Sequence, residues 1–119
     1  MLALVVDDDT TVRTLVRSIL LADNFETIEA ADGDQALKMV NVLGGSVDVI
    51  ITDIQMPGMD GVSFANAVTR AFPCVPIVLM SGYPAPEGDF VFVQKPFSWM
   101  AMRSVIRRVI RKAYLPPAA

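Results

Sequence analysis

Residues 2–9 read Leu-Ala-Leu-Val-Val-Asp-Asp-Asp, an apolar run that ends abruptly in three carboxylates. A short apolar run without polar alternation is typical of a strand buried on both faces of a sheet. Residues 47–53, Val-Asp-Val-Ile-Ile-Thr-Asp, form a second apolar run that closes on Asp53. These two stretches predict a sheet covered by helices on both faces, with acidic side chains at one edge.

The rest of the chain alternates between helical and extended patterns. Apolar residues recur at helical spacing over 12–20, 36–43, 62–72 and 102–113, and short extended runs occupy 25–30, 76–80 and 90–93. We expect the helices to be capped by Thr10 or Thr11, Asp32, Asp60 and Ser98. Alternating strands and helices predict a parallel sheet with right-handed crossovers.

One connection is too short for this pattern. The fourth and fifth strands are separated by eight residues, 82–89, which include two prolines and two glycines. A crossover that contains a helix needs about a dozen residues or more, whereas eight extended residues reach roughly 26 Å. We therefore expect a parallel fifth strand, with the helix before it absent or reduced to a turn.

Composition limits the chemistry. The chain has 119 residues, 53% of them hydrophobic, which is enough for one domain with a real core. We expect that domain to span 1–115, with a disordered tail over 116–119. The absence of histidine and the single cysteine exclude Ser–His and Cys–His nucleophile pairs and cysteine-based zinc sites. Without a membrane-length apolar run or a signal-like start, we expect a cytoplasmic protein with no membrane insertion.

Charge is unevenly distributed along the chain. Residues 1–89 hold all 13 acidic residues and 4 basic ones, whereas residues 90–119 hold 6 basic residues and no acid. Direct binding of nucleic acid would need a basic surface across the domain, and the acidic part argues against it. We expect the basic residues of the last helix on a solvated face, which would also attract an acidic partner. They are Arg103, Arg107, Arg108, Arg111 and Lys112.

Polar side chains follow the apolar strands: Asp7, Asp8 and Asp9, then Asp53, Ser81 and Lys95. The carboxyl ends of the strands form the ligand crevice of an open α/β sheet, so these side chains should converge. Converging carboxylates repel one another unless a cation balances them, and Mg²⁺ prefers such oxygen ligands. With a lysine and a hydroxyl beside them, they describe a phosphoryl-transfer site in which Asp53 can be the nucleophile.

Four segments, in this order and spacing, resemble the receiver domains of two-component response regulators. They are residues 4–9, the stretch from Asp53 to Gly61 (Asp-Ile-Gln-Met-Pro-Gly-Met-Asp-Gly), Ser81-Gly82, and Lys95-Pro96-Phe97. The resemblance covers the whole chain except the connection over 82–89. It implies an α/β, flavodoxin-like doubly wound fold with a five-stranded parallel sheet in the order 2-1-3-4-5.

The same resemblance implies a metal and phosphoryl site. Asp53 would accept a phosphoryl group from a histidine kinase. Asp8, Asp53 and the main-chain carbonyl of Gln55 would hold Mg²⁺, with Asp7 acting through a metal-bound water. Lys95 and Ser81 would each bond a phosphoryl oxygen. The Lys95–Pro96 bond is commonly cis in such domains.

The resemblance also implies a switch. Phe92 occupies the place of an aromatic residue that moves together with Ser81, and Gln55 and Tyr83 occupy variable positions that tune dephosphorylation. Ser81-Gly82-Tyr83 is similar to a short motif of atypical receivers associated with HWE-type kinases. We therefore expect an HWE-type or hybrid sensor kinase and an unidentified downstream protein as partners. Residues 82–89 are expected to become ordered when Asp53 is modified.

Two other functions fit part of the same pattern. The segment from Asp7 to Thr11 fits the Asp-x-Asp-x-Thr motif of haloacid dehalogenase-type phosphatases, but no acidic pair follows Lys95 as that family requires. A receiver that binds partners without taking phosphate is the third possibility, and the complete set of acidic pocket residues argues against it. We expect a signal-transfer domain that catalyses only its own phosphorylation and dephosphorylation, rather than an enzyme acting on other substrates.

Overall fold

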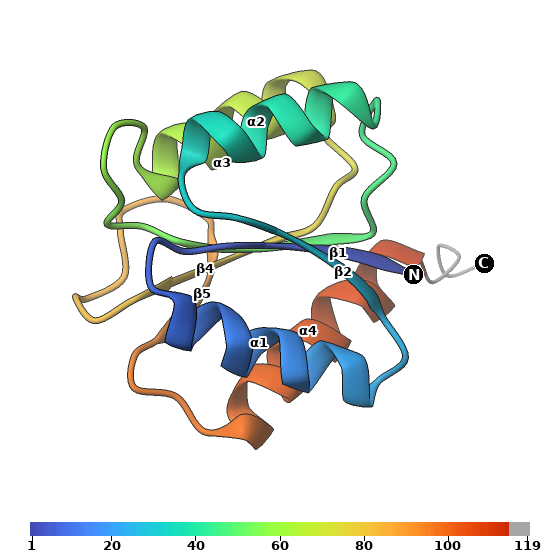
Figure 1. Cartoon of the computed structure of the whole chain (residues 1–119), viewed down its shortest axis with the longest axis vertical. Coiled ribbons are helices and arrows are strands. Elements are labelled where there is room, and N and C mark those ends of the chain that lie inside the picture. Colours follow the sequence, from blue (N-terminus) through green and yellow to red (C-terminus); the bar gives the residue numbers. More distant parts are fainter. Residues whose placement is uncertain (115–119) are drawn as a thin grey trace.

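A computed structural model describes residues 1–114, in which five strands form a parallel sheet between two pairs of helices (Figure 1). The elements are β1 (Leu2–Val6), α1 (Thr10–Ala22), β2 (Glu26–Ala30), α2 (Gly33–Val42), β3 (Val49–Asp53), α3 (Gly61–Ala71), β4 (Ile77–Ser81), β5 (Val91–Gln94) and α4 (Trp99–Tyr114). The strand order β2-β1-β3-β4-β5 confirms the predicted doubly wound sheet. The tail predicted over 116–119 lies outside the described residues.

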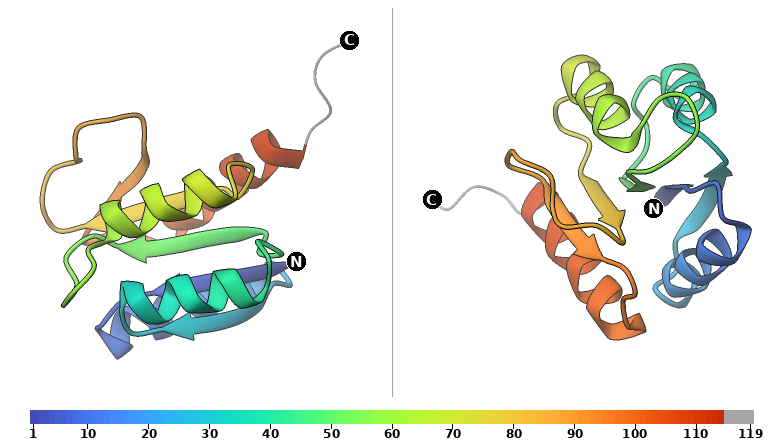
Figure 2. Two further views of the ribbon diagram at one scale, coloured as in Figure 1. Left: turned by 90° about the horizontal axis from the view of Figure 1, so that it is seen from above. Right: turned by 90° about the vertical axis from the view of Figure 1, so that its left-hand side faces the viewer.

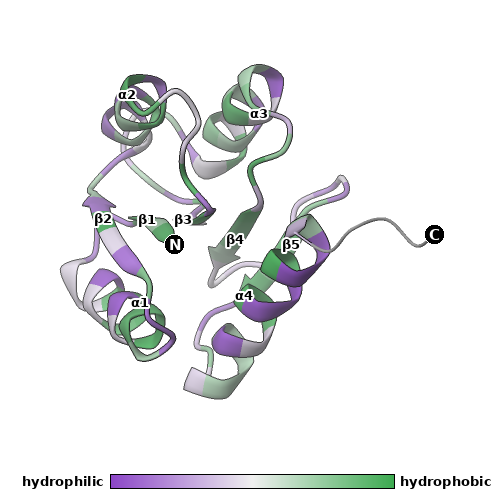
Figure 3. Cartoon of the chain, turned by 90° about the vertical axis from the view of Figure 1, so that its right-hand side faces the viewer, coloured by the Kyte–Doolittle hydropathy of each residue, from purple (hydrophilic) through white to green (hydrophobic). Residues whose placement is uncertain are grey.

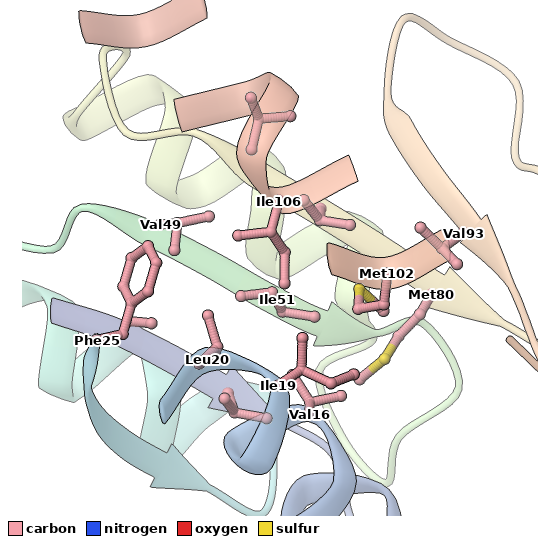
Figure 4. Packing of buried hydrophobic residues seen from close by; sticks show 14 residues of the cluster. Val16, Ile19, Leu20, Phe25, Val49, Ile51, Met80, Val93, Met102 and Ile106 are labelled. Carbon is pink, nitrogen blue, oxygen red and sulfur yellow. The ribbon is translucent and has the colours of Figure 1, made fainter. Parts of the chain in front are cut away.

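Strand side chains alternate between two hydrophobic clusters, one on each face of the sheet. In β1, Ala3 and Val5 belong to the cluster under α1 and α4, whereas Leu4 and Val6 belong to the cluster under α2 and α3. Figure 4 shows the first cluster, in which side chains of α1 and α4 gather over Ile51. Burial on both faces explains why the sequences of β1, β3 and β4 are almost continuously apolar.

No helix lies between β4 and β5, as the short connection predicted. Residues 82–90 form an irregular loop with two bends, and β5 still pairs with β4 in parallel, with Phe92 opposite Leu79. Val91 and Val93 face the α1–α4 cluster, so alternation places half-buried Phe92 on the other face of the sheet. Within residues 1–114, no helix covers β5 on that face, whereas α2 and α3 cover the neighbouring strands (Figure 3).

The cap of α1 differs from the prediction. Asp9, not Thr10 or Thr11, is the N-cap, and its carboxylate accepts a hydrogen bond from the Thr11 amide at 2.8 Å. The helix starts early because the Asp7 carboxylate accepts the Asp9 amide at 2.8 Å and turns the chain directly after β1. The predicted caps Asp32, Asp60 and Ser98 each accept a hydrogen bond from a main-chain amide of the first turn.

Asp23, the C-cap of α1, joins α1 to α4. Its carboxylate accepts hydrogen bonds from the guanidinium groups of Arg103 and Arg107, with shortest distances of 2.9 and 3.0 Å. Arg107 is exposed, as predicted for the basic face, whereas Arg103 is half-buried, and the sequence did not predict that both pair with Asp23. The bonds from Arg103 and then Arg107 lower the pKa of Asp23 from 3.8 to about 2.

None of the helices in residues 1–114 has the length and apolar character that a membrane crossing requires.

Replacing Asp23 with asparagine should weaken the link between α1 and α4. The folded-state pKa of Asp23 lies below its ordinary value, so the stabilisation is present above about pH 4 and is lost as the pH falls towards 2. We expect Asp23→Asn to lower the free energy of unfolding by about 1 kcal/mol at pH 7, since partly exposed ion pairs contribute little more. Urea unfolding across this pH range measures the difference, with Glu87→Gln as the exposed control. A difference independent of pH would contradict the assignment.

Candidate functional site

The carboxyl ends of the strands meet at one edge of the sheet, at the left in Figure 1 and towards the viewer in the right panel of Figure 2. Asp7 directly follows β1, Asp53 ends β3, Ser81 ends β4, and Lys95 directly follows β5. Parallel pairing of β1 with β3, β3 with β4 and β4 with β5 brings these positions to the same edge. The topology thus brings together residues from four separate parts of the chain.

Three carboxylates form the centre of this edge. One carboxylate oxygen from each of Asp7, Asp8 and Asp53 lies within 4.8 Å of the other two. Asp7 is fully buried and Asp53 is 5% exposed, whereas Asp8 is exposed. Lys95 Nζ lies 2.9 Å from Asp7 Oδ2 and 3.3 Å from Asp53 Oδ1. Lys95 thus pairs with two of the three carboxylates, and the cluster as a whole holds more negative than positive charge.

Burial and charge shift the pKa values of two of these groups. Burial, and then the charge of Asp7, raise the pKa of Asp53, although Lys95 acts in the opposite direction. Burial alone would lower the pKa of Lys95, but the hydrogen bond and charge of Asp7, followed by the charge of Asp53, raise it overall. Lys95 is therefore held as a cation. A further positive charge beside Asp53 would stabilise its ionised carboxylate.

The donor set suits a hard divalent cation. All three candidate ligands are carboxylates, with no histidine or cysteine among them, and such oxygen ligands suit Mg²⁺. The excess negative charge would be balanced by a divalent ion, and exposed Asp8 gives the cluster contact with solvent. The residues present therefore fit the Mg²⁺ site that the sequence led us to expect.

Ser81 lies beside the acidic cluster, but its buried hydroxyl bonds elsewhere. Ser81 Oγ donates a hydrogen bond to Gln55 Oε1 at 2.6 Å and accepts one from the Tyr83 amide at 3.0 Å. The Tyr83 ring is 67% exposed, and Phe92 lies on β5. Within residues 1–114, neither Tyr83 nor Phe92 makes a polar side-chain contact with the cluster. The Lys95–Pro96 peptide bond is cis, as the resemblance implied.

Sequence reasoning missed Arg13, which contacts the acidic turn from α1. Its Nη1 donates a hydrogen bond to the main-chain oxygen of Asp7 at 2.5 Å, and its Nε lies 3.3 Å from Glu29 Oε1. One local signal pointed to it, because the first turn of a helix favours acidic residues and α1 has none there. The acceptors that Arg13 contacts offset this unfavourable position.

A family model described as a response regulator receiver domain matches residues 3–107. The chain belongs to this family. It is 30% identical over 118 residues to the sensor kinase CckA of Brucella abortus, and the match covers 92% of this chain. The chain spans only 12% of that kinase, so it corresponds to one small part of it.

Solved receiver domains share the fold of this one. The receiver domain of the hybrid histidine kinase CckA is 29% identical, with a TM-score of 0.82, covering 92% of this chain and 99% of that chain. The chemotaxis protein CheY4 of Vibrio cholerae is 30% identical, with a TM-score of 0.81, covering 91% of this chain and 97% of that chain. Receiver domains act in signal transfer with histidine kinases and in general bind Mg²⁺, which agrees with the acidic cluster found here.

Gly61 begins α3 directly behind Asp53, and its lack of a side chain supports the site. A Cβ at this position would lie 2.0 Å from the main-chain oxygen of Asp53 and 2.8 Å from Ile54 Cα. The Gly61 amide also donates a hydrogen bond to the Ile54 carbonyl at 2.9 Å. Any side chain on Gly61 must therefore push α3 away from the end of β3.

Gly61→Ala should consequently be destabilising, by about 1–3 kcal/mol in the free energy of unfolding, as for other overpacked positions. It should also shift the amide resonances of Asp53 and Ile54. Gly82→Ala is the matched control, since a Cβ there meets no atom within 4 Å. Denaturant unfolding and ¹⁵N spectra of both variants measure these effects, and equal stability of the two would contradict the close packing behind Asp53.

Proposed function

We propose that this receiver domain accepts a phosphoryl group on Asp53 from a sensor histidine kinase and passes the signal on through a changed surface. The observation that carries the proposal is the placement of Asp53. Its carboxylate lies in a buried position 3.3 Å from Lys95 Nζ and within 4.8 Å of two other carboxylates. Asp53 therefore lies between the Lys95 ammonium group and the carboxylates of Asp7 and Asp8, which are candidate ligands for a metal ion.

The transfer needs one bond to form and one to break. An Asp53 carboxylate oxygen attacks the phosphorus of a phosphohistidine, the P–N bond breaks, and the electron pair leaves with the imidazole. The Lys95 ammonium stabilises the charge that develops on the phosphoryl oxygens. Asp8, Asp53 and the Gln55 carbonyl would hold Mg²⁺, with Asp7 acting through water, and the bound ion would supply further positive charge at those oxygens.

The partners follow from the same proposal. The donor is an HWE-type or hybrid histidine kinase on the cytoplasmic side, and the receiver of the signal is a downstream protein rather than a nucleic acid. The domain, residues 1–115, catalyses only its own phosphorylation and dephosphorylation. A haloacid dehalogenase-type phosphatase has no support, because no acidic residue follows Lys95 to complete its metal site.

Asp53→Asn tests the acceptor while keeping the size of the side chain. Incubation with acetyl phosphate and Mg²⁺ should add one phosphoryl group to the wild type and none to Asp53→Asn, as measured by intact mass. Asp60→Asn is the matched control, since it changes a carboxylate of the same loop and asparagine still caps α3. Asp60→Asn should be phosphorylated like the wild type.

Each other outcome points to a different function. A full adduct on Asp53→Asn would place the acceptor elsewhere. A wild type that takes neither a phosphoryl group nor beryllofluoride, which stands in for it, would be a binding module. Turnover of a generic aryl phosphate far above background would favour the phosphatase.

We propose that Gln55 restrains the switch in the unphosphorylated state. The Ser81 hydroxyl, bonded to Gln55 at 2.6 Å, must break that bond before it can reach a phosphoryl oxygen on Asp53. Phe92 would move with Ser81, and Tyr83, whose amide bonds the same hydroxyl, would carry the change into the loop over 82–89. The ordering of that loop on phosphorylation stays a prediction.

Gln55→Met, which removes the acceptor at similar size, should free the Ser81 hydroxyl. Since a neutral hydrogen bond is worth about 0.5–1.5 kcal/mol, we expect beryllofluoride to bind roughly 2- to 10-fold more tightly. Gln94→Met, a change of the same type at an exposed position of β5, should have no effect. Isothermal titration in Mg²⁺ buffer provides the affinities, and unchanged or weaker binding by Gln55→Met would show that Gln55 does not restrain the switch.

A further inference from the structure

Arg13 contacts the main chain of Asp7, next to the carboxylates of the candidate metal site. Its guanidinium reaches three acceptors: the Asp7 carbonyl at 2.5 Å, Glu29 Oε1 at 3.3 Å and Thr10 Oγ1 at 3.4 Å. The side chain is only 17% exposed. Arg13 therefore ties the turn after β1 to α1 and to β2.

Asp7 lies at the centre of this turn, and each of its polar groups is engaged. Its amide donates a hydrogen bond to the Ala30 carbonyl at 3.2 Å, and its Oδ1 accepts the Asp9 amide at 2.8 Å. Its Oδ2 accepts Lys95 Nζ at 2.9 Å, and its carbonyl accepts Arg13. Of these four bonds, the one from Arg13 is the side-chain bond that fixes the main chain where it turns towards Asp8.

We propose that Arg13 is a positioning residue for divalent-cation binding, which acts by holding the main chain of Asp7 so that the Asp7 and Asp8 carboxylates face Asp53. The inference rests on the proposed Mg²⁺ site, and it adds a group that does not itself touch the ion. Removing the hydrogen-bond partner of a metal ligand typically changes metal affinity by about 10- to 100-fold, and Arg13 acts one step further out, through the main chain, so we expect the lower end of that range.

The sign of the effect separates positioning from simple charge. Arg13 is a cation near an acidic cluster, so removing its charge alone would make the cluster more attractive to Mg²⁺ and would tighten binding. Removing a group that positions the ligands would weaken binding instead. Positioning and charge thus predict opposite changes in the Mg²⁺ dissociation constant.

The experiment measures Mg²⁺ affinity by isothermal titration of the whole chain, with MgCl₂ alone as the probe. Arg13→Met should bind Mg²⁺ about 10-fold more weakly than the wild type. Arg13→Lys keeps the charge but lacks the planar guanidinium group, so its Mg²⁺ affinity should lie between those of Arg13→Met and the wild type. Arg17→Met is the matched control, because it removes the same charge from the exposed face of the same helix, and it should bind as tightly as the wild type or slightly more tightly.

A second measurement distinguishes a local loss of Mg²⁺ binding from a general loss of structure. Urea unfolding and the amide resonances of Asp8 and Asp9 are recorded for each variant, and if Arg13→Met does not fold, Arg13→Lys alone decides the question. Binding by the folded Arg13 variants that equals or exceeds that of the wild type would overturn the inference and leave the phosphoacceptor proposal intact. A wild type that binds no Mg²⁺ would overturn the proposed metal site, and this inference with it.

Discussion

The ammonium group of Lys95 between Asp7 and Asp53 is the interaction on which the rest of this site depends. Two carboxylates buried at neighbouring strand ends repel each other, and this repulsion adds to burial in raising the pKa of Asp53. Lys95 reaches both from the far side of β4, with Nζ–O distances of 2.9 and 3.3 Å. One ammonium group offsets only part of the negative charge of three carboxylates, so the cluster can still take the positive charge of Mg²⁺.

The absence of a helix between β4 and β5 does not change the positions of Lys95, Asp7 and Asp53 at the strand ends. The acidic and basic groups sit at strand ends, and those ends are fixed by the sheet itself. The Lys95 amide donates a hydrogen bond to the Ser81 carbonyl at 2.7 Å, so the two strand ends stay joined although only a loop connects them. The site therefore keeps its geometry although no helix connects these two strands.

The sequence predicted the features that depend on local pattern. The continuous apolar runs predicted the buried strands, and the short connection predicted that no helix lies between β4 and β5. The polar residues at the strand ends predicted the acidic cluster. What it could not predict were side-chain pairings between distant residues. Asp23 with Arg103 and Ser81 with Gln55 are separated by 80 and 26 positions and have no local signature. The cap of α1 was missed because Asp7 turns the chain one residue earlier than the threonines suggested.

The most direct test of the central claim is to locate the acyl phosphate chemically. Protein treated with acetyl phosphate and Mg²⁺ is reduced with borohydride, which converts an aspartyl phosphate into homoserine, and the peptides are sequenced by mass spectrometry. The account predicts homoserine in place of Asp53 and at no other acidic position. Homoserine in place of Asp7 or Asp8 would contradict it, because the acceptor would then be a residue assigned here to the metal.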